Sequence, residues 1–174
     1  AAFDRGACPK AFLVGERVRR VLKEMVLDRD AARCNELHLQ VLGQNTLLLP
    51  HALEVCRGLS REHRLYIVTN AVAAVQRSRL AGSAIAPYIT GAFISEEAGA
   101  SKPSAAYFDY VFSRIDGITR ENCLLVGDSL SSDIRGANNY GLPCCWYNPK
   151  GAARPEDLRI DCEIRDLRQL YDLV

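Results

Sequence analysis

The segment that most constrains the fold is residues 123–141, CLLVGDSLSSDIRGANNYG. Its apolar run at 124–126 predicts a short buried strand, which Gly127 ends. Two carboxylates follow, Asp128 and Asp133, and a helix is expected from near Asp133 to the final glycine. A strand that delivers acids to a strand-to-helix turn is typical of α/β enzyme sites, where ligands bind outside the carboxyl ends of parallel strands.

Helices and strands are predicted to alternate from Pro50 to the C-terminus. Strands are expected near 65–68, 91–95, 123–126, 143–147 and 162–164, and helices near 50–60, 71–80, 104–115, 133–141 and 166–173. The segment EEAGASKP, residues 96–103, is expected to be a loop. This alternation predicts an α/β fold with an open, doubly wound parallel sheet and helical crossovers.

Residues 11–44 lack strand signals and predict a pair of helices. Apolar residues recur at helical spacing in both halves: Val18, Val21, Leu22 and Met25, then Cys34, Leu37, His38, Val41 and Leu42. Asp28 and Asp30 are the expected caps between the helices. His38 lies on the apolar stripe and is expected to pack in the core rather than to bind a ligand. The pattern changes near 47–50, which divides the chain into residues 1–48 and 49–174.

The amino-acid composition limits the binding partners and the cellular compartment that are expected for this chain. The net charge is +1 with acids and bases interleaved, which favours neither a nucleic acid polymer nor a membrane as partner. No apolar run approaches the roughly 20 residues of a membrane helix, and the first residues lack a signal-peptide pattern. Seven cysteines without a C-x-x-C pair favour reduced thiols over disulfides or a zinc site. A cytoplasmic protein is expected, and its oligomeric state stays open.

Four features follow predicted strands and are expected to meet at one edge of the sheet: Thr69–Asn70, Lys102–Pro103, Asp128 and Asp133. Two nearby carboxylates suit Mg²⁺, which binds few protein ligands and keeps several waters. A hydroxyl group and backbone N–H groups at a helix start suit phosphate oxygens, and a lysine adds a point charge. Together they predict phosphoryl transfer, in which positioning and charge neutralisation dominate.

Each feature alone has a simpler interpretation. Thr69–Asn70 is compatible with a strand end and a helix cap, Lys102 with a solvated surface lysine, and Asp133 with a helix N-cap. Asp128 is harder to explain in this way, because an ionised acid beside a buried strand is costly without a partner. The ordered set is therefore more specific than any member.

The order hhhTN, K-P and hhhGDxxxxD resembles motifs two, three and four of the haloacid dehalogenase-like (HAD) hydrolase superfamily, from about Pro50 to the C-terminus. The resemblance implies a Rossmann-like core, with residues 1–48 as part of an α-helical cap. It also implies roles for individual residues: Thr69 and Asn70 bind the transferred phosphoryl group, Lys102 holds the nucleophile and phosphate charges together, Asp128 binds Mg²⁺, and Asp133 binds or supports the metal.

The residues of two segments indicate one branch of the superfamily. Residues 94–112, ISEEAGASKPSAAYFDYVF, and 124–148 resemble the phosphatase branch that contains noncanonical pyrimidine 5'-nucleotidases. The G-D pair at 127–128 differs from the E-D pair usual in the β-phosphoglucomutase-like branch, and true dehalogenases use no metal. A Mg²⁺-dependent phosphatase acting on a small phosphorylated metabolite, such as a nucleoside monophosphate, is therefore the preferred hypothesis. A phosphomutase, a dehalogenase or a non-catalytic phosphate-binding protein remain alternatives.

One family motif is not matched. Motif one, a D-x-D after the first strand, supplies the aspartate nucleophile, and no strand-like run upstream of Thr69 ends in one. Asp4 does not fit, because residues 3–12 resemble the middle of the cap. In the superfamily the motif-one strand lies between those bearing Thr69 and Asp128, so both should lack a neighbour here, which is costly for buried backbone groups. The chain is expected to be part of a longer enzyme that forms a phospho-aspartyl intermediate, and to be inactive alone.

Overall fold

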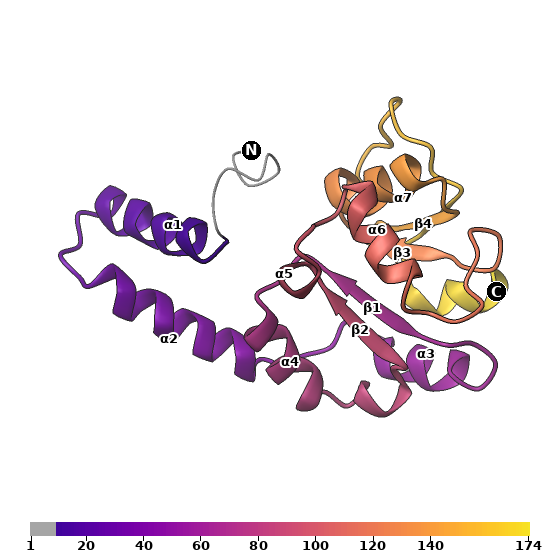
Figure 1. Cartoon of the computed structure of the whole chain (residues 1–174), viewed down its shortest axis with the longest axis horizontal. Coiled ribbons are helices and arrows are strands. Elements are labelled where there is room, and N and C mark those ends of the chain that lie inside the picture. The colour runs from indigo at the N-terminus through magenta and orange to yellow at the C-terminus, as the bar shows by residue number, and fades with distance from the viewer. Residues whose placement is uncertain (1–9) are drawn as a thin grey trace.

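The computed structural model describes the backbone of residues 10–174 and the side chains of residues 15–174 (Figure 1). The strands are β1 (Tyr66–Thr69), β2 (Gly91–Ile94), β3 (Leu125–Gly127), β4 (Cys144–Tyr147) and β5 (Cys162–Ile164). The helices are α1 (Lys10–Glu24), α2 (Ala31–Gln44), α3 (Ala52–Leu59), α4 (Ala73–Ala81), η2 (Ala86–Tyr88), α5 (Ser95–Ala98), α6 (Ala105–Phe112), η3 (Leu130–Ile134), α7 (Arg135–Tyr140) and η4 (Leu167–Asp172). None of these helices is long and apolar enough to cross a membrane.

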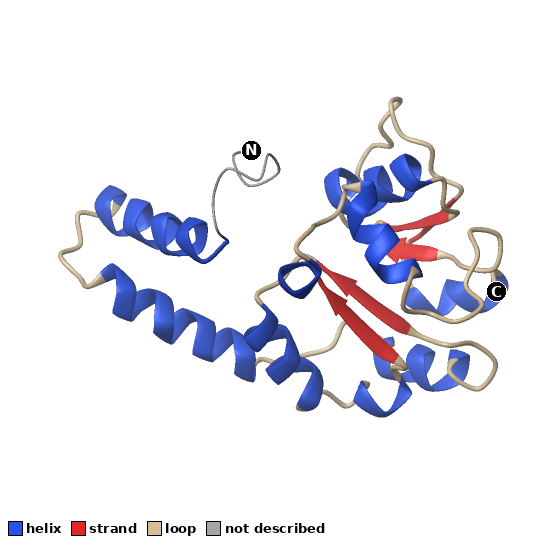
Figure 2. Cartoon of the chain, viewed as in Figure 1, coloured by secondary structure: helices blue, strands red, loops and turns tan. Residues whose placement is uncertain are grey.

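The parallel strands form two separate sheets. β1 pairs with β2 from Tyr66↔Gly91 to Thr69↔Ile94, and β4 pairs with both β3 and β5. Within residues 10–174, β1 and β3 share no ladder, so each has one edge without a strand neighbour. Figure 2 shows the two groups of strands apart. The predicted α/β fold with parallel strands is confirmed, and the division falls where the family resemblance implies a missing strand.

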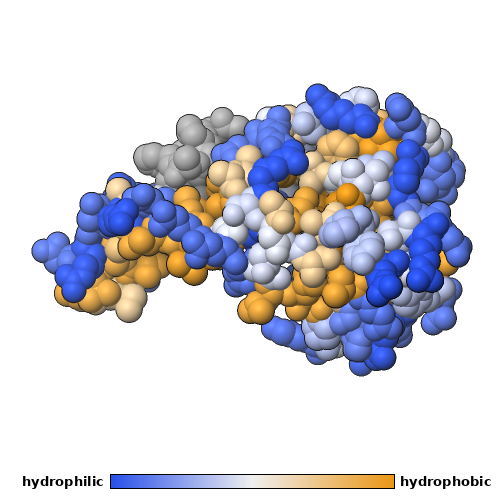
Figure 3. All heavy atoms as spheres, turned by 90° about the horizontal axis from the view of Figure 1, so that it is seen from below, coloured by the Kyte–Doolittle hydropathy of each residue, from blue (hydrophilic) through white to orange (hydrophobic). Residues whose placement is uncertain are grey.

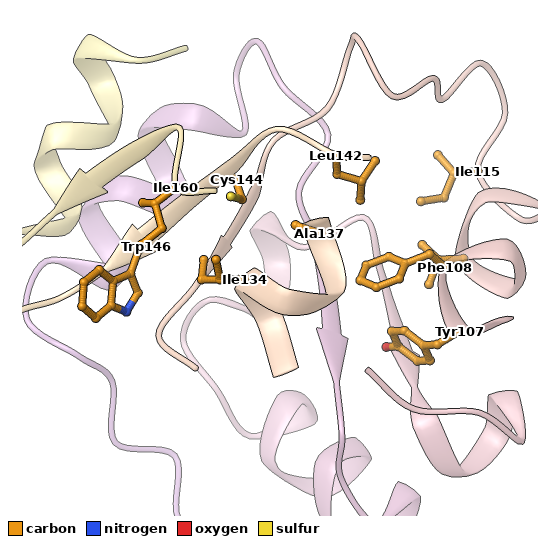
Figure 4. Close-up of a cluster of buried hydrophobic side chains, with 10 residues drawn as sticks. Tyr107, Phe108, Ile115, Ile134, Ala137, Leu142, Cys144, Trp146 and Ile160 are labelled. Carbon is orange, nitrogen blue, oxygen red and sulfur yellow. The ribbon is translucent and has the colours of Figure 1, made fainter. Parts of the chain in front are cut away.

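Helices cover the strands on two faces. On one face α6 and α7 pack in a core cluster with β4 (Figure 4), and side chains of β1 and β2 also contact this cluster. Its buried members are Tyr107, Phe108, Val111, Ile115, Ile134, Ala137, Leu142, Cys144, Trp146 and Ile160. On the other face α3 and η4 pack on β4 and β5 through a second cluster of Val55, Cys145, Ile164 and Leu170. The α6–α7 layer therefore connects the two sheets, which explains how they keep one fold without sharing a ladder.

The first two helices form an extension on the core (Figure 1). Asp30 caps α2 by accepting hydrogen bonds from two backbone N–H groups, and α2 packs against α4. The Ser78 hydroxyl donates to the carbonyl O of Gly43 at 3.0 Å. The division into residues 1–48 and 49–174 stays a prediction.

The apolar stripe of this extension is largely exposed. Met25 is 62% and Val41 65% accessible, and Figure 3 shows hydrophobic side chains gathered along the extension. His38 is also exposed. The expectation that His38 packs in the core is therefore wrong, because no other described helix covers that face.

Some segments differ in detail from the sequence predictions. Residues 95–98, expected to belong to a strand end and a loop, form α5. Glu96 and Glu97 in its first turn favour a helix there, and Gly99 ends it in the left-handed conformation at φ 66°. The last predicted helix is a 3₁₀ helix, η4, which Asp166 and Gln169 begin with a reciprocal capping box. These differences leave the order of the major elements unchanged.

The six cysteines in the described part are free thiols. Cys144 and Cys145 are fully buried in β4, and burial raises the pKa of the Cys145 thiol to about 12. Cys145 therefore stays protonated, and chemically inert, at neutral pH.

We expect Cys145 to resist alkylation by iodoacetamide at pH 8 in the native protein and to react once the protein is unfolded in urea. Because its folded pKa is raised above the ordinary value of 9.0, the thiol contributes stability below that value. This contribution is lost as the pH rises from about 9 towards 12. Peptide mass mapping after labelling tests the first expectation, with half-buried Cys34 as the internal comparison. Equal labelling of both thiols in the native state would contradict it.

Candidate active site

The side chain of Lys102 lies in the gap between the two sheets. Its Nζ donates to the Asp133 carboxylate and to the Val68 backbone carbonyl, each at 2.6 Å. Val68 belongs to β1 and Asp133 follows β3, so one ammonium group joins both halves of the fold. The side chain is only 7% exposed, which excludes a solvated surface lysine.

Asn70 holds the loop that carries Lys102. Its side-chain Nδ2 donates to the Lys102 carbonyl O at 2.8 Å, and its Oδ1 accepts from the Lys102 backbone N–H at 3.0 Å. These paired bonds fix the Lys102 backbone beside the carboxyl end of β1. In this structure Asn70 therefore positions Lys102, and its predicted contact with substrate stays a prediction.

Tyr107 is a site residue that sequence reasoning missed. It lies on α6 and is fully buried, and its hydroxyl accepts from the Thr69 N–H at 2.9 Å and donates to the Phe93 carbonyl O at 2.6 Å. Burial raises the pKa of Tyr107 well above its usual range, so the hydroxyl remains neutral. It ties the carboxyl ends of β1 and β2 together next to Thr69. Its place on the buried face of a helix just after Lys102–Pro103 was the available signal.

The turn after β3 is built around Ser129 and Asp133. The Ser129 hydroxyl accepts from the Ser132 N–H at 3.2 Å, and the Ser129 N–H donates to Asp133 Oδ2 at 3.0 Å. Ser129 is thus the N-cap, and the interpretation of Asp133 as a simple N-cap is wrong. The Ile134 N–H bonds to the Ser129 carbonyl O, which makes the first turn a π-helix, a feature often found at functional sites.

Gly127 makes room for this turn. A Cβ atom added at residue 127 would lie 2.4 Å from Asp133 Cβ and 2.5 Å from its carboxylate. Only glycine lets the Asp133 side chain pack directly against β3 and reach Lys102. Both residues of the G-D pair therefore matter for the site. Gly127 leaves the space that the Asp133 side chain fills, and Asp128 follows at the end of the strand.

Asp128 presents the free carboxylate of the site. The residue is exposed, and within the described part of the chain its carboxylate has no hydrogen-bond or ion-pair partner. Its backbone carbonyl accepts from the Trp146 indole N–H at 3.1 Å. Asp128 and Asp133 flank one short turn. The free Asp128 carboxylate is the type of ligand that Mg²⁺ takes from a protein, usually with one or two carboxylates and several waters. Both carboxylate oxygens of Asp133 already accept hydrogen bonds, from Lys102 and from the Ser129 N–H. No group of three or more His, Cys, Asp and Glu residues able to hold a metal occurs among the described residues, so water or other groups would complete the shell.

The structure brings together most of the predicted set. Asn70, next to Thr69, bonds the Lys102 backbone, and Lys102 links β1 to Asp133. Asp128 directly follows β3 and makes no hydrogen bond or ion pair with them among the described residues. Within residues 10–174 no strand precedes β1, so the strand that would carry motif one is not among the described elements. The D-x-D of Asp28 and Asp30 lies between α1 and α2, and Asp30 serves there as the cap of α2. Asp4 lies outside the described residues.

Known proteins match this chain in sequence and in structure. The HAD-hydrolase-like family model matches residues 99–169. HAD-hydrolase YfnB of Bacillus subtilis is 35% identical over 99% of this chain and 74% of its own length. Pyrimidine 5'-nucleotidase PynA of Streptococcus pneumoniae is 32% identical over 94% and 69%, and pyrimidine 5'-nucleotidase YjjG of Escherichia coli is 30% identical over 85% and 66%.

The structural match agrees with the sequence match. A crystal structure of YfnB bound to magnesium superposes with a TM-score of 0.90 over 99% of this chain and 75% of that chain. The identity, the coverage and the shared fold all lead to one assignment. The chain belongs to the haloacid dehalogenase-like hydrolase superfamily.

Proposed function

We propose that the intact protein is a Mg²⁺-dependent phosphoric monoester hydrolase that acts in the cytoplasm on a small phosphorylated metabolite, with nucleoside monophosphates as the substrate class. One observation carries the proposal: a buried ammonium group, Lys102, lies between the strand that bears Thr69 and the turn that bears Asp133. A cation fixed at the ends of two parallel strands suits the charge of a phosphoryl group. Two relatives that are pyrimidine 5'-nucleotidases support the substrate class.

Each residue has a role that its surroundings permit. The Thr69 backbone N–H is taken by Tyr107, so the Thr69 hydroxyl is the group that would bind a phosphoryl oxygen. Lys102 would neutralise phosphate and nucleophile charge while Asn70 holds it in place. Asp128 would bind Mg²⁺, with Asp133 as a second ligand or as a support of the metal's water shell, and the charge of Mg²⁺ would stabilise the phosphoryl oxygens when it is bound. Residues 1–48 would form part of a cap above this site.

We further propose that the intact protein supplies its nucleophile, an aspartate, on an extended segment between β1 and β3. The support is that β1 and β3 share no ladder among the described residues, and that the Val68 carbonyl of β1 accepts its hydrogen bond from the Lys102 side chain. The chain also spans about two thirds to three quarters of the length of YfnB, PynA and YjjG. The aspartate would attack phosphorus and release the alcohol, and water would then hydrolyse the phospho-aspartate.

The test compares residues 1–174 with a longer version that includes the native preceding segment. We expect the longer protein to hydrolyse p-nitrophenyl phosphate with Mg²⁺, and residues 1–174 to show no turnover above the blank. A panel of pyrimidine and purine nucleoside monophosphates and sugar phosphates then identifies the leaving group.

Other results would overturn specific parts of the proposal. Turnover by residues 1–174 would show that the nucleophile lies within them. Release of halide from haloacids without Mg²⁺ would establish a dehalogenase instead. Phosphate binding without turnover by the longer protein would establish a non-catalytic binding protein.

A further inference from the structure

A buried tryptophan contacts the backbone of the predicted metal ligand. Trp146, the only tryptophan of the chain, lies on β4 and is 3% exposed. Its indole Nε1–H donates to the carbonyl O of Asp128 at 3.1 Å. Asp128 lies just beyond β3, so the bond joins the core to an exposed residue of the site.

The sheet register explains why the indole reaches this carbonyl. Trp146 pairs with Gly127, and paired residues of parallel strands place their side chains on the same face. On that face Gly127 has no side chain, and the space is taken by Asp133. In Figure 4 the indole lies near Ile134, at the end of the core cluster away from Ile115. The tryptophan therefore packs beside the turn that carries both acids.

The bond also restricts Asp128 itself. The carboxylate of Asp128 has no partner of its own among the described residues, so its direction depends on its backbone. An indole N–H on a fixed, buried ring holds the carbonyl of that backbone, and a buried indole N–H normally keeps such a partner. Hydrogen bonds of this kind, one step removed from a metal, orient the ligand and strengthen binding.

We infer that Trp146 is a positioning residue for the metal site, which acts by holding the Asp128 backbone so that its carboxylate faces the cation. The inference rests on the proposed Mg²⁺ site and adds to it a residue that does not touch the metal. Removing the indole N–H should weaken Mg²⁺ binding even where the fold is kept.

The test uses Trp146→Phe in the intact protein, with Mg²⁺ alone as the probe. We expect the dissociation constant for Mg²⁺, measured by calorimetry, to rise about tenfold. In ¹H–¹⁵N spectra of the unsubstituted protein, the indole N–H signal that Trp146→Phe removes should shift as Mg²⁺ is added. In Asp128→Asn that signal should remain and should lose its response to Mg²⁺.

A matched control separates positioning from packing. Ile115→Val removes a methylene group from the same buried cluster without a polar contact, so it should lower stability and leave the Mg²⁺ dissociation constant unchanged. Equal Mg²⁺ affinity in Trp146→Phe and the unsubstituted protein, or equal weakening by Ile115→Val, would overturn the inference and leave the proposed Mg²⁺ site standing. Absence of Mg²⁺ binding by the unsubstituted protein would overturn both.

Discussion

Replacing Lys102 with methionine is expected to lower the free energy of unfolding by about 3–5 kcal/mol, the cost typical of breaking a buried ion pair by removing one partner. Methionine keeps most of the side-chain volume, so the loss comes from the polar groups left behind. The Asp133 carboxylate would stay buried without its cation, and the Val68 carbonyl would lose its donor. Urea denaturation followed by circular dichroism measures the change.

Two comparisons test whether the loss of stability in Lys102→Met comes from the burial of its ion pair. Arg77→Met breaks the exposed pair with Glu97 and should cost at most about 1 kcal/mol. The double variant Lys102→Met/Asp133→Asn should lose less unfolding free energy than the sum of the two single variants, because it no longer buries an unpaired Asp133 carboxylate. If Lys102→Met lost no more unfolding free energy than Arg77→Met, the Lys102 ammonium would not be buried between the two sheets.

The second large effect is expected at Gly127. In Gly127→Ala the new methyl group would overlap the Asp133 side chain and backbone shifts would follow, at a cost of about 1–3 kcal/mol in unfolding free energy. The displaced Asp133 would also move from Lys102, so Mg²⁺ binding should weaken together with stability. Thermal unfolding with and without Mg²⁺ measures both, because a ligand that binds only the folded state raises the melting temperature.

Gly15→Ala is the matched control. Gly15 lies within α1, and no described atom outside the backbone of that helix lies within 4 Å of the position that a Cβ would take there, so alanine should favour the helix. We expect unchanged or slightly higher stability and an unchanged response to Mg²⁺. A Gly127→Ala protein as stable as Gly15→Ala would mean that Asp133 does not pack against β3.

The order of the elements could be predicted because it depends on local sequence, and that order also predicts which candidate site residues meet. Short apolar runs bounded by glycine, proline and polar residues predicted all five strands, and the parallel order placed Thr69, Lys102 and the two acids at one edge. The family motifs add the chemistry, since Thr69, Lys102, Asp128 and Asp133 occur in the order that the HAD-like hydrolases use.

The failures arose where a residue's surroundings come from distant segments. His38 looked like a core residue because its helical stripe is apolar, but whether a stripe is covered depends on what packs against it. The hydrogen bonds of Tyr107 and Trp146 were not predicted, because a sequence does not show which carbonyl or N–H group a buried polar atom meets.

The sequence by itself determined the fold class and the family resemblance, and it predicted which residues form the candidate site. Only the tertiary structure decided what those residues do to one another. It placed the Lys102 ammonium between two sheets, held the Lys102 backbone through Asn70, and left Asp128 as the free acid. The physical reason is that hydrogen bonds and ion pairs depend on distances of about 3 Å, which folding sets between segments far apart in the chain.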